Sequence, residues 1–366
     1  MAKEKYYTLD NILTYNADYN VIYGERSNGK TTSVLLYAFE QICYNNYQGQ
    51  LAIIRRYADD YKGAKGQQMF ESFMHNGWVE KYTHGEYNSI KYYSAQWFLC
   101  KYDEDGELVA KRDKPFALAF SLSSEEHYKS TSYPDVKWIL FDEFISRQYY
   151  LPQEFVTFQN LLSTIIRLRD DVKIFMCGNT INKYCVYFAE MGLSNIKKQD
   201  KGSIDLYTYG ESELRVAVEY SDFPMKKKKS NKYFAFNNPK LNMITDGGWE
   251  IDIYPHLPYK YKPKDVVGIF YIKFEGDVLQ GNVIQIKDDL FIYIHYKTKE
   301  IKEDTTRRVY QQSTDVRYNY SCNIFKIHNK FDKYVNTLIN MDKVFYQDNE
   351  VGEIVRNYFN WCRVNK

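Results

Sequence analysis

A short run of residues near the start of the chain has the types and spacing that bind phosphate. Residues 24–31 read Gly-Glu-Arg-Ser-Asn-Gly-Lys-Thr and fit the pattern G-x-x-x-x-G-K-[ST]. In this pattern backbone N–H groups face phosphate oxygens, the lysine reaches the β- and γ-phosphates and the hydroxyl binds Mg²⁺. The run predicts a nucleotide and Mg²⁺ site; a glycine-rich turn with an exposed lysine is the alternative. The residues expected around the phosphates are Gly24, Ser27, Asn28, Gly29, Lys30, Thr31 and Thr32.

A pair of carboxylates follows the apolar residues 136–141. A buried strand over these residues would deliver Asp142 to the edge of a sheet, where it can hold Mg²⁺. Glu143 would then orient and deprotonate an attacking water, which is the chemistry of an ATPase rather than a kinase. The alternative is an ordinary acidic strand end.

Two further polar groups could complete a hydrolytic site. Asn179 follows the apolar residues 172–177 and could sense a γ-phosphate, although Gly-Asn is also a common turn sequence. Arg167 and Arg169 end the helix expected over 153–169. An arginine delivered across a subunit boundary could neutralise charge at the γ-phosphate; alternatively, both arginines are solvated partners of the helix dipole.

A competing GTPase interpretation depends on two short matches. Residues 329–332 read Asn-Lys-Phe-Asp and match N-K-x-D, and residues 265–268 match D-x-x-G. Both patterns are short enough to arise by chance. The D-x-x-G match also lies far beyond the phosphate run, in another expected domain, so one compact nucleotide site is not predicted to include it.

The elements that would position these side chains alternate between strand and helix over residues 1–205. Short apolar runs at 20–23, 51–54, 136–141 and 172–177 predict buried strands, and 31–44 predicts an amphipathic helix. Further helical sequence is expected up to about residue 82, and antiparallel strands over 89–121. The order predicts an α/β fold with a mainly parallel sheet covered on both faces.

The sequence changes character near residue 206. Strand-like alternation at 206–220 leads to the basic run Lys226, Lys227, Lys228 and Lys229, then to glycines and prolines. We expect a P-loop ATPase domain over 1–205, a linker module over 206–255 and an α+β C-terminal domain over 256–366. The last of these would hold antiparallel strands at 266–274, 281–286 and 290–296 and a closing helix. The lysine run could bind DNA phosphates or be a solvated loop.

Composition limits the class of protein. The 366 residues carry a net charge of +2, so total charge neither requires nor excludes a nucleic-acid partner. The six cysteines and six histidines are scattered, which argues against a disulfide framework or a zinc site. An apolar run long enough to span a membrane and a signal peptide are both missing from the sequence, so no membrane association is expected.

Together these residues resemble the DNA-packaging ATPases of phi29-like tailed bacteriophages, which are relatives of large terminases. The resemblance covers nearly the whole chain. Its segments are the phosphate run 24–31, Ile-Ile-Arg-Arg-Tyr at 53–57, Tyr-Lys-Ser-Thr-Ser-Tyr-Pro at 128–134, Phe-Asp-Glu-Phe at 141–144, Thr-Ile-Ile-Arg-Leu-Arg at 164–169 and Asp-Asn-Glu-Val at 348–351.

The resemblance implies roles for individual residues. Lys30 and Thr31 correspond to the phosphate-loop pair, and Asp142 and Glu143 to the Mg²⁺-binding and water-activating carboxylates. Lys129 corresponds to a family lysine near the nucleotide, and Arg167 to the trans-acting arginine finger. Arg55 or Arg56 would lie near the nucleotide. The sequence departs from the family at three places: Gly178 replaces a hydroxyl residue before Asn179, and Arg147 and Gln148 change the charges after the acidic strand.

The resemblance also implies that the C-terminal domain is a vestigial RNase H-like nuclease. Working nucleases of this type hold two metals with clustered acids, and the first acid lies on the opening strand in a Gly-x-Asp pattern. Here that strand has Phe270 in the acid position, so no nuclease activity is expected. Asp277, Asp288 and Asp289 are interpreted as turn acids.

The function implied is a viral motor that hydrolyses ATP to move double-stranded DNA into a preformed procapsid. The implied partners are DNA, further copies of the chain in a ring that the family expectation makes a pentamer, the phage portal and a packaging RNA. The implied location is the host cytoplasm, docked on the portal and not retained in the mature virion. Two alternatives stay open: a terminase-like protein with an active nuclease, and an assembly protein ordered by nucleotide binding.

Overall fold

The structure is a computed structural model of the 366-residue chain. It describes residues 7–26, 28–146, 150–151, 153–179, 185–196, 198–210, 213–222, 254–257, 260–313 and 315–364. Two sheets with separate hydrophobic cores account for these residues. None of the described helices is long and apolar enough to cross a membrane.

The first body holds a ten-stranded mixed sheet, and its described elements follow in chain order. They are α1 (Asp10–Leu13), β1 (Tyr19–Gly24), α2 (Lys30–Tyr44), β2 (Gln50–Arg55), the 3₁₀ helix η1 (Ala58–Tyr61), α3 (Ala64–Gln68), α4 (Glu71–His75), α5 (Trp78–Tyr82), β3 (Ser89–Tyr93), β4 (Gln96–Tyr102), β5 (Leu108–Lys111), β6 (Ala117–Ser121), the 3₁₀ helix η2 (Leu122–Tyr128), β7 (Val136–Asp142), α6 (Glu154–Ile166), β8 (Lys173–Asn179), α7 (Val186–Glu190), β9 (Ile204–Tyr209) and β10 (Leu214–Ser221).

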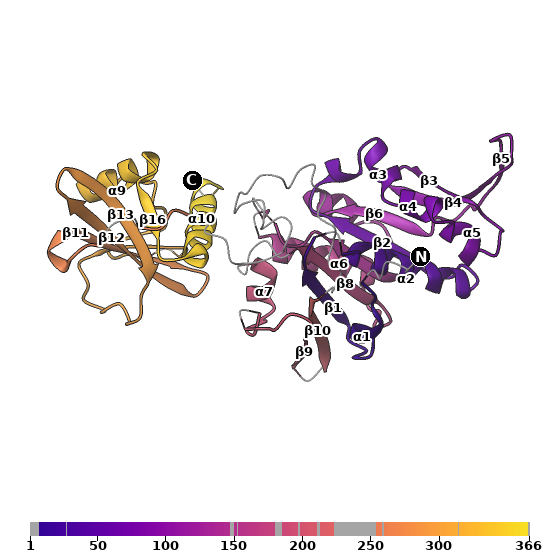
Figure 1. Ribbon diagram of the computed structural model, residues 1–366, viewed down its shortest axis with the longest axis horizontal. Coiled ribbons are helices and arrows are strands. Elements are labelled where there is room, and N and C mark those ends of the chain that lie inside the picture. The colour runs from indigo at the N-terminus through magenta and orange to yellow at the C-terminus, as the bar shows by residue number, and fades with distance from the viewer. Residues whose placement is uncertain are drawn as a thin grey trace.

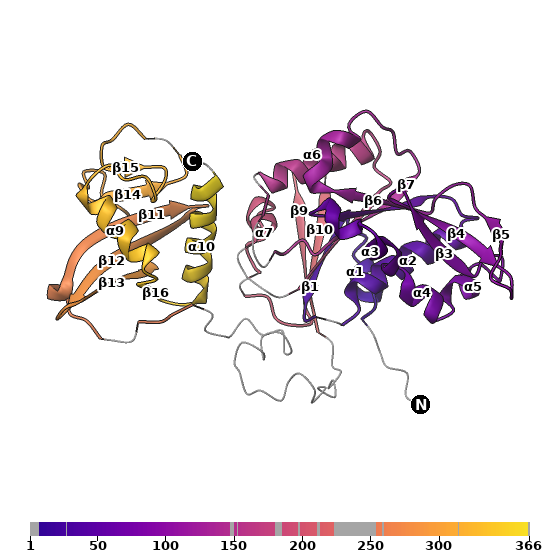
Figure 2. The same ribbon diagram turned by 90° about the horizontal axis from the view of Figure 1, so that it is seen from above.

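The centre of this sheet is parallel, in the order β6-β2-β7-β8-β1-β10. Helices cover both faces, with α1 to α5 on one face and α6 and α7 on the other (Figure 2). Successive strand residues serve opposite cores: Ile22 packs with α2 and its neighbours, whereas Val21 and Tyr23 pack towards α6 and α7. This is the alternation that two covered faces require. The predicted α/β class with a mainly parallel sheet is confirmed.

Several expected elements differ in detail. The helical stretch before Tyr82 consists of short segments, separated by turns at Gly63 and Gly77, which both have positive φ. Strand β6, expected in an antiparallel group, runs parallel to β2. The helix expected to reach 169 ends at Ile166, because Arg167 takes a left-handed backbone with φ 54°.

The expected boundary at 205/206 is also displaced. Strand β9 straddles this boundary and β10 falls inside the expected linker module, yet β10 pairs with β1 from Tyr19↔Val216 to Gly24↔Ser221. The sequence shows strand-like alternation there but does not reveal that β10 lies beside β1. The first sheet therefore extends to residue 221.

The second body, drawn in orange and yellow in Figure 1, holds a six-stranded sheet in the order β15-β14-β11-β12-β13-β16, and Figure 2 labels each of these strands. Its elements are the 3₁₀ helix η3 (Pro263–Asp265), β11 (Val266–Phe274), β12 (Asp277–Ile286), β13 (Asp289–Tyr296), β14 (Arg308–Gln311), β15 (Tyr320–Ser321), α9 (Lys330–Asn340), β16 (Val344–Tyr346) and α10 (Asn349–Val364). Strands β11, β12 and β13 are antiparallel as predicted, and β14 is parallel to β11. The buried residues of α10, including Ile354 and Tyr358, belong to the core that lines this sheet.

Candidate active site

The carboxyl ends of the parallel strands bring the candidate residues together. Strands β1, β2, β7, β8 and β10 end at Gly24, Arg55, Asp142, Asn179 and Ser221. In open α/β sheets, ligands bind outside this edge of the sheet. Residues from five separate parts of the sequence therefore meet at one place, and the hydrogen bonds between them define a single site.

The phosphate loop, residues 24–31, leads directly into α2. The helix begins after Gly29, whose φ of 93° is a left-handed conformation suited to glycine and which has no side chain to cap the helix. Asn28 Oδ1 accepts from the Lys30 N–H at 3.3 Å. A helix N-terminus offers backbone N–H groups and a positive dipole end to an anion. Thr32 lies in the first turn of the same helix. Ser27 lies outside the described residues.

Lys30 is almost fully buried, and oxygens of the loop hold its ammonium group. Its Nζ lies 2.6 Å from the carbonyl oxygen of Glu25 and 3.1 Å from Asn28 Oδ1. A longer contact of 3.5 Å joins Nζ to Asn179 Oδ1 at the end of β8. The lysine and the candidate γ-phosphate sensor are thus direct neighbours, although they are separated by 149 positions in the sequence.

Thr31 and Asp142 form the second contact of the site. The Thr31 hydroxyl donates to Asp142 Oδ1 at 2.7 Å. A hydroxyl and a carboxylate held this close are oxygen ligands of the kind that Mg²⁺ takes in nucleotide sites, where phosphates supply others. Among the described residues there is no cluster of three or more His, Cys, Asp or Glu side chains that could hold a metal ion. The Thr31 hydroxyl and the Asp142 carboxylate fit Mg²⁺ bound together with a nucleotide.

Arg55 neutralises the other oxygen of Asp142. Its Nη2 lies 2.6 Å from Asp142 Oδ2, and the carboxylate is 4% exposed. Burial by itself would lower the pKa of Arg55, but the charge and hydrogen bond of Asp142 raise it above its ordinary value. The family resemblance implies only that Arg55 lies near a nucleotide; the structure places it on Asp142, the carboxylate expected to bind Mg²⁺.

Glu143 follows Asp142 with an exposed side chain and a left-handed backbone, φ 58°. Arg56 lies behind this turn and is buried. It donates to the carbonyl oxygens of Glu143 and Phe144 and forms an ion pair with Glu154. Its nitrogens are therefore bonded to protein groups, and the expected contact of Arg56 with a nucleotide has no support in this geometry.

The two candidate finger arginines differ sharply. Arg169 donates to the backbone carbonyls of Tyr133 and Pro134 in the loop before β7. It also donates to the carbonyl of Ile165 in α6. Arg167 is exposed and donates to the Thr131 carbonyl at 3.1 Å. The neighbouring Leu168 is fully exposed. Arg169 is therefore bonded to several carbonyls of its own chain, whereas Arg167 is exposed and its side chain has one described bond, to Thr131.

Lys129 lies at the end of η2 with its ammonium near two acids. Its Nζ is 2.5 Å from Glu126 Oε1 and 3.6 Å from Glu125 Oε1. The hydrogen bond with Glu126 raises the pKa of Lys129. The described contacts of Lys129 are these acids; none joins it to the phosphate loop. Arg147, Gln148 and the lysine run Lys226–Lys229 lie outside the described residues.

Sequence reasoning missed the contribution of β10 to the site. Ser221 is fully buried; its Oγ accepts from Asn28 Nδ2 at 3.1 Å and donates to the Tyr23 carbonyl at 3.0 Å. A Cβ on Gly24 would lie 2.1 Å from this oxygen, so the loop needs glycine there. Lys201 pairs with Glu25 of the loop and with Asp222. The bond between Asn28 and Ser221 spans 193 positions, and no local pattern marks it.

The N-terminal segment also clamps the loop. The Tyr7 N–H donates to the Asn28 carbonyl at 3.0 Å, and the Tyr7 hydroxyl donates to Glu219 Oε2 on β10 at 2.6 Å. Burial raises the pKa of Glu219, and the Tyr7 hydrogen bond partly opposes that rise. The phosphate loop is thus bonded both to β10 and to the N-terminal segment without a ligand.

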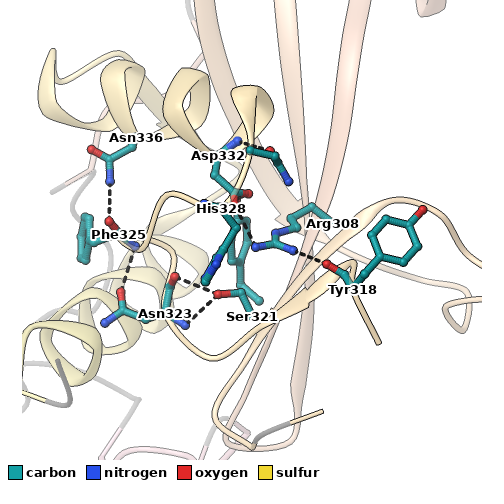
Figure 3. Close-up of polar contacts among 10 residues, drawn as sticks. Arg308, Tyr318, Ser321, Asn323, Phe325, His328, Asp332 and Asn336 are labelled. Carbon is teal, nitrogen blue, oxygen red and sulfur yellow. Dashed lines mark hydrogen bonds and ion pairs between the residues drawn. The ribbon is translucent and has the colours of Figure 1, made fainter. Parts of the chain in front are cut away.

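The N-K-x-D match has a structural explanation in the second body (Figure 3). Asn329 caps α9 by accepting from the Asp332 N–H at 2.8 Å. Asp332 is fully buried and accepts from Arg308 Nη2 at 2.8 Å and from Tyr310 at 2.9 Å. The carboxylate of Asp332 is bonded to Arg308 and Tyr310, so it is not available to read a guanine base. This geometry argues against the GTPase interpretation.

Comparisons with known proteins find relatives in sequence and in fold. DNA packaging proteins of Bacillus phages phi29 and PZA are each 26% identical over 191 residues, which is 51% of this chain and 50% of theirs. The matched part thus spans about half the length of these curated relatives.

Two solved structures share the fold. That described as the bacteriophage Phi-29 viral genome packaging motor assembly has a TM-score of 0.58 at 20% identity, covering 97% of this chain and 98% of its own. That described as the Phi-28 gp11 DNA packaging motor has a TM-score of 0.54 at 20% identity, covering 99% and 97%. Residues 1–362 match the family described as Podovirus DNA encapsidation protein (Gp16). With a match of this extent, the chain belongs to the family of podovirus DNA encapsidation proteins.

Proposed function

We propose that this protein is the ATPase of a viral genome-packaging motor, which hydrolyses ATP to translocate double-stranded DNA into a preformed procapsid. The observation that carries the proposal is the meeting of Lys30, Thr31, Asp142 and Asn179 at one sheet edge, with Glu143 beside them. The membership of the chain in a family of DNA encapsidation proteins supports the proposal that DNA is what the motor moves.

Each residue has a role in this proposal. Lys30 exchanges its bonds to loop carbonyls for phosphate oxygens, while the N–H groups at the start of α2 bind the same phosphates. Thr31 and Asp142 hold Mg²⁺, which neutralises charge on the phosphates when it is bound. Glu143, whose carboxylate is exposed at the edge, orients the attacking water and accepts its proton. Asn179 contacts the γ-phosphate next to Lys30.

Arg167 is the trans-acting arginine of this proposal. Its exposure and its single described side-chain hydrogen bond support the assignment, because a finger must reach a neighbouring subunit. Arg169 is excluded from that role by its bonds to its own backbone. Lys129 is kept as a residue that approaches the nucleotide, which requires it to exchange Glu126 for phosphate.

The second body is proposed to be a vestigial RNase H-like domain without nuclease activity. Its three antiparallel strands followed by strands parallel to the first support this fold. Phe270, in the position of the first catalytic acid, is fully buried, and a Cβ on Gly281 would lie 2.1 Å from its ring. Asp288 lies in a turn and Asp289 opens β13. An apolar side chain packed in the core therefore occupies the position where a nuclease would need a metal-binding acid.

The proposed partners follow from the motor role. Copies of the chain form a ring, for which the family expectation is a pentamer, that docks on the phage portal in the host cytoplasm, with a packaging RNA as a further partner. We propose an ATPase domain ending near residue 222, in place of 205, followed by a linker and the second body from 254. The lysines at 226–229 would bind DNA phosphates without regard to sequence.

The test is steady-state ATP hydrolysis with and without long duplex DNA, with Glu143→Gln as the blank. We expect hydrolysis that rises with DNA of any sequence and falls by roughly 10²–10⁴-fold in Glu143→Gln. A rate of ATP hydrolysis that does not change when DNA is added, measured with the portal present, would contradict the proposed motor function. Tight ATP binding without turnover would favour the nucleotide-ordered assembly protein.

A further inference from the structure

The turn that carries Glu143 takes an uncommon backbone. Its φ of 58° is a left-handed conformation, which non-glycine residues keep only where surrounding groups hold them. The next residue, Phe144, is fully buried and packs against Tyr187 and Phe188. The direction in which the Glu143 carboxylate leaves the chain depends on this turn. The question is therefore which groups hold it.

Arg56 is the described side chain that holds the turn from behind. Its Nη1 donates to the Glu143 carbonyl at 3.2 Å, and its Nη2 donates to the Phe144 carbonyl at 2.9 Å. Arg56 follows β2, the strand beside β7, so it is anchored to the sheet one strand away from the carboxylates. The guanidinium plane can bind two groups in fixed directions at once, which a lysine cannot do.

Glu154 in turn fixes Arg56. Its two carboxylate oxygens accept from Arg56 Nε and Nη2, each at 2.8 Å. The remaining capacity of Glu154 is filled by the Tyr187 hydroxyl at 2.7 Å and the Leu151 N–H at 2.6 Å. Glu154 is 1% exposed and Arg56 8%, so water hardly reaches the pair. A fully satisfied buried network of this kind holds a single geometry.

We propose that the buried Arg56–Glu154 pair positions Glu143 for catalysis, by fixing the backbone turn that directs its carboxylate at the nucleotide site. The inference rests on the proposed ATPase function. Arg56 and Glu154 are positioning residues: neither touches substrate, and both act through the peptide groups at Glu143 and Phe144.

The pair also joins the turn to α6. Glu154 is the first residue of this helix, and Arg167 immediately follows its last residue. The helix is a rigid element of 13 residues. Glu143, the proposed base of one site, is therefore connected through Arg56 and Glu154 to the start of α6. Arg167, the arginine proposed for the neighbouring site, follows the end of the same helix, so the helix fixes the distance between these two parts of one chain.

The test uses the full chain and replaces the whole pair, as Arg56→Met with Glu154→Leu. Replacing both members avoids a buried unpaired charge, which single truncations would leave. Thermal unfolding, ATP KM and kcat are measured together. We expect folded protein with an ATP KM within about threefold of wild type and a kcat reduced roughly 10²-fold, the effect of a small misplacement of a catalytic group.

The second body supplies a matched control. Arg308 and Asp332 form another buried arginine–carboxylate pair, with side chains 4% and 0% exposed. The pair replacement Arg308→Met with Asp332→Leu should change thermal stability similarly and leave basal ATP turnover unchanged. A kcat within twofold of wild type in the Arg56/Glu154 replacement would overturn the proposal.

Arg56→Lys provides a second variant, should the pair replacement fail to fold. It keeps the charge, but one ammonium cannot bind two carbonyls and both carboxylate oxygens in the same directions. Reduced kcat with unchanged KM would support the proposal, and full kcat would refute it. A wild-type protein without Glu143-dependent hydrolysis would instead refute the ATPase function itself, and this inference with it.

Discussion

At the scale of residues, the site depends on polar side chains that hold one another before ligand binds. Asn28 is the central member of the phosphate loop: its amide donates to Ser221, and its Oδ1 accepts from the backbone and side-chain nitrogens of Lys30. Because Asn28 and Ser221 are both buried, water cannot easily replace this bond. The position of Lys30, the lysine proposed to bind phosphate, therefore depends in part on β10.

Replacing Ser221 with alanine tests this anchor. We expect the ATP KM to rise about fivefold, the worth of one lost net hydrogen bond, with a smaller change in kcat. Isothermal titration with a non-hydrolysable nucleotide would check that the loss is one of binding. Ser72→Ala, on the exposed surface of α4, is the control. Equal KM values in Ser221→Ala and wild type would show that the loop holds Lys30 unaided.

At the scale of elements, α6 links two parts of the proposed mechanism. Its first turn carries Glu154, and its last residue precedes Arg167. After the helix ends, Arg169 binds carbonyls of the loop before β7 and of α6 itself, so the exit of the helix is held firmly. This arrangement leaves Arg167 and Leu168 exposed beyond a fixed end.

Alanine substitutions at Arg169 and Arg167 should therefore affect different properties, the first stability and the second ATP turnover. Arg169→Ala removes a donor from several backbone carbonyls, and we expect it to destabilise the protein by roughly 1–3 kcal/mol in thermal or denaturant unfolding. Arg167→Ala should leave the unfolding midpoint unchanged and reduce ATP turnover of the assembled protein by roughly 10³-fold. Equal losses of stability in both variants would contradict the division of roles.

At the scale of the whole molecule, each active site is proposed to need two chains. In this proposal Glu143 acts within its own chain, whereas Arg167 acts on a neighbour. Heterologous contacts of this kind close into rings, in which every subunit both supplies and receives an arginine. The described residues show Arg167 at the end of a helix, away from the bonds that fix Lys30 and Asp142.

Mixing two inactive variants tests this requirement. Glu143→Gln and Arg167→Ala proteins should each hydrolyse ATP poorly when assembled alone. In an equal mixture, some sites combine an intact base with a neighbour's intact arginine, and we expect about a quarter of the wild-type rate from random placement. Assembly of the mixed rings is verified by sedimentation. A mixture as inactive as its components would show that both groups act in one chain.

The amino-acid sequence by itself determined the local chemistry. The phosphate loop is a run of consecutive residues, so its glycines, lysine and threonine are brought together by chain connectivity alone. The strands that end at Asp142 and Asn179 were likewise predictable, because buried parallel strands are short apolar runs and their carboxyl ends share an edge. The α/β class and the antiparallel group from β11 to β13 followed from the same patterns.

Only the tertiary structure decided the contacts between distant segments. The alternation at 206–220 marked a strand but not its partner, and pairing with β1 moved the end of the first sheet to residue 221. Arg56 looked like a nucleotide ligand until packing placed it on Glu154, 98 positions away. Asp332 looked like part of a guanine-reading motif until it was found on Arg308. Local patterns record which side chains are apolar but not which distant segment lies beside them. For Arg56 and Asp332, burial of the charge is permitted only by a partner that the fold brings to it.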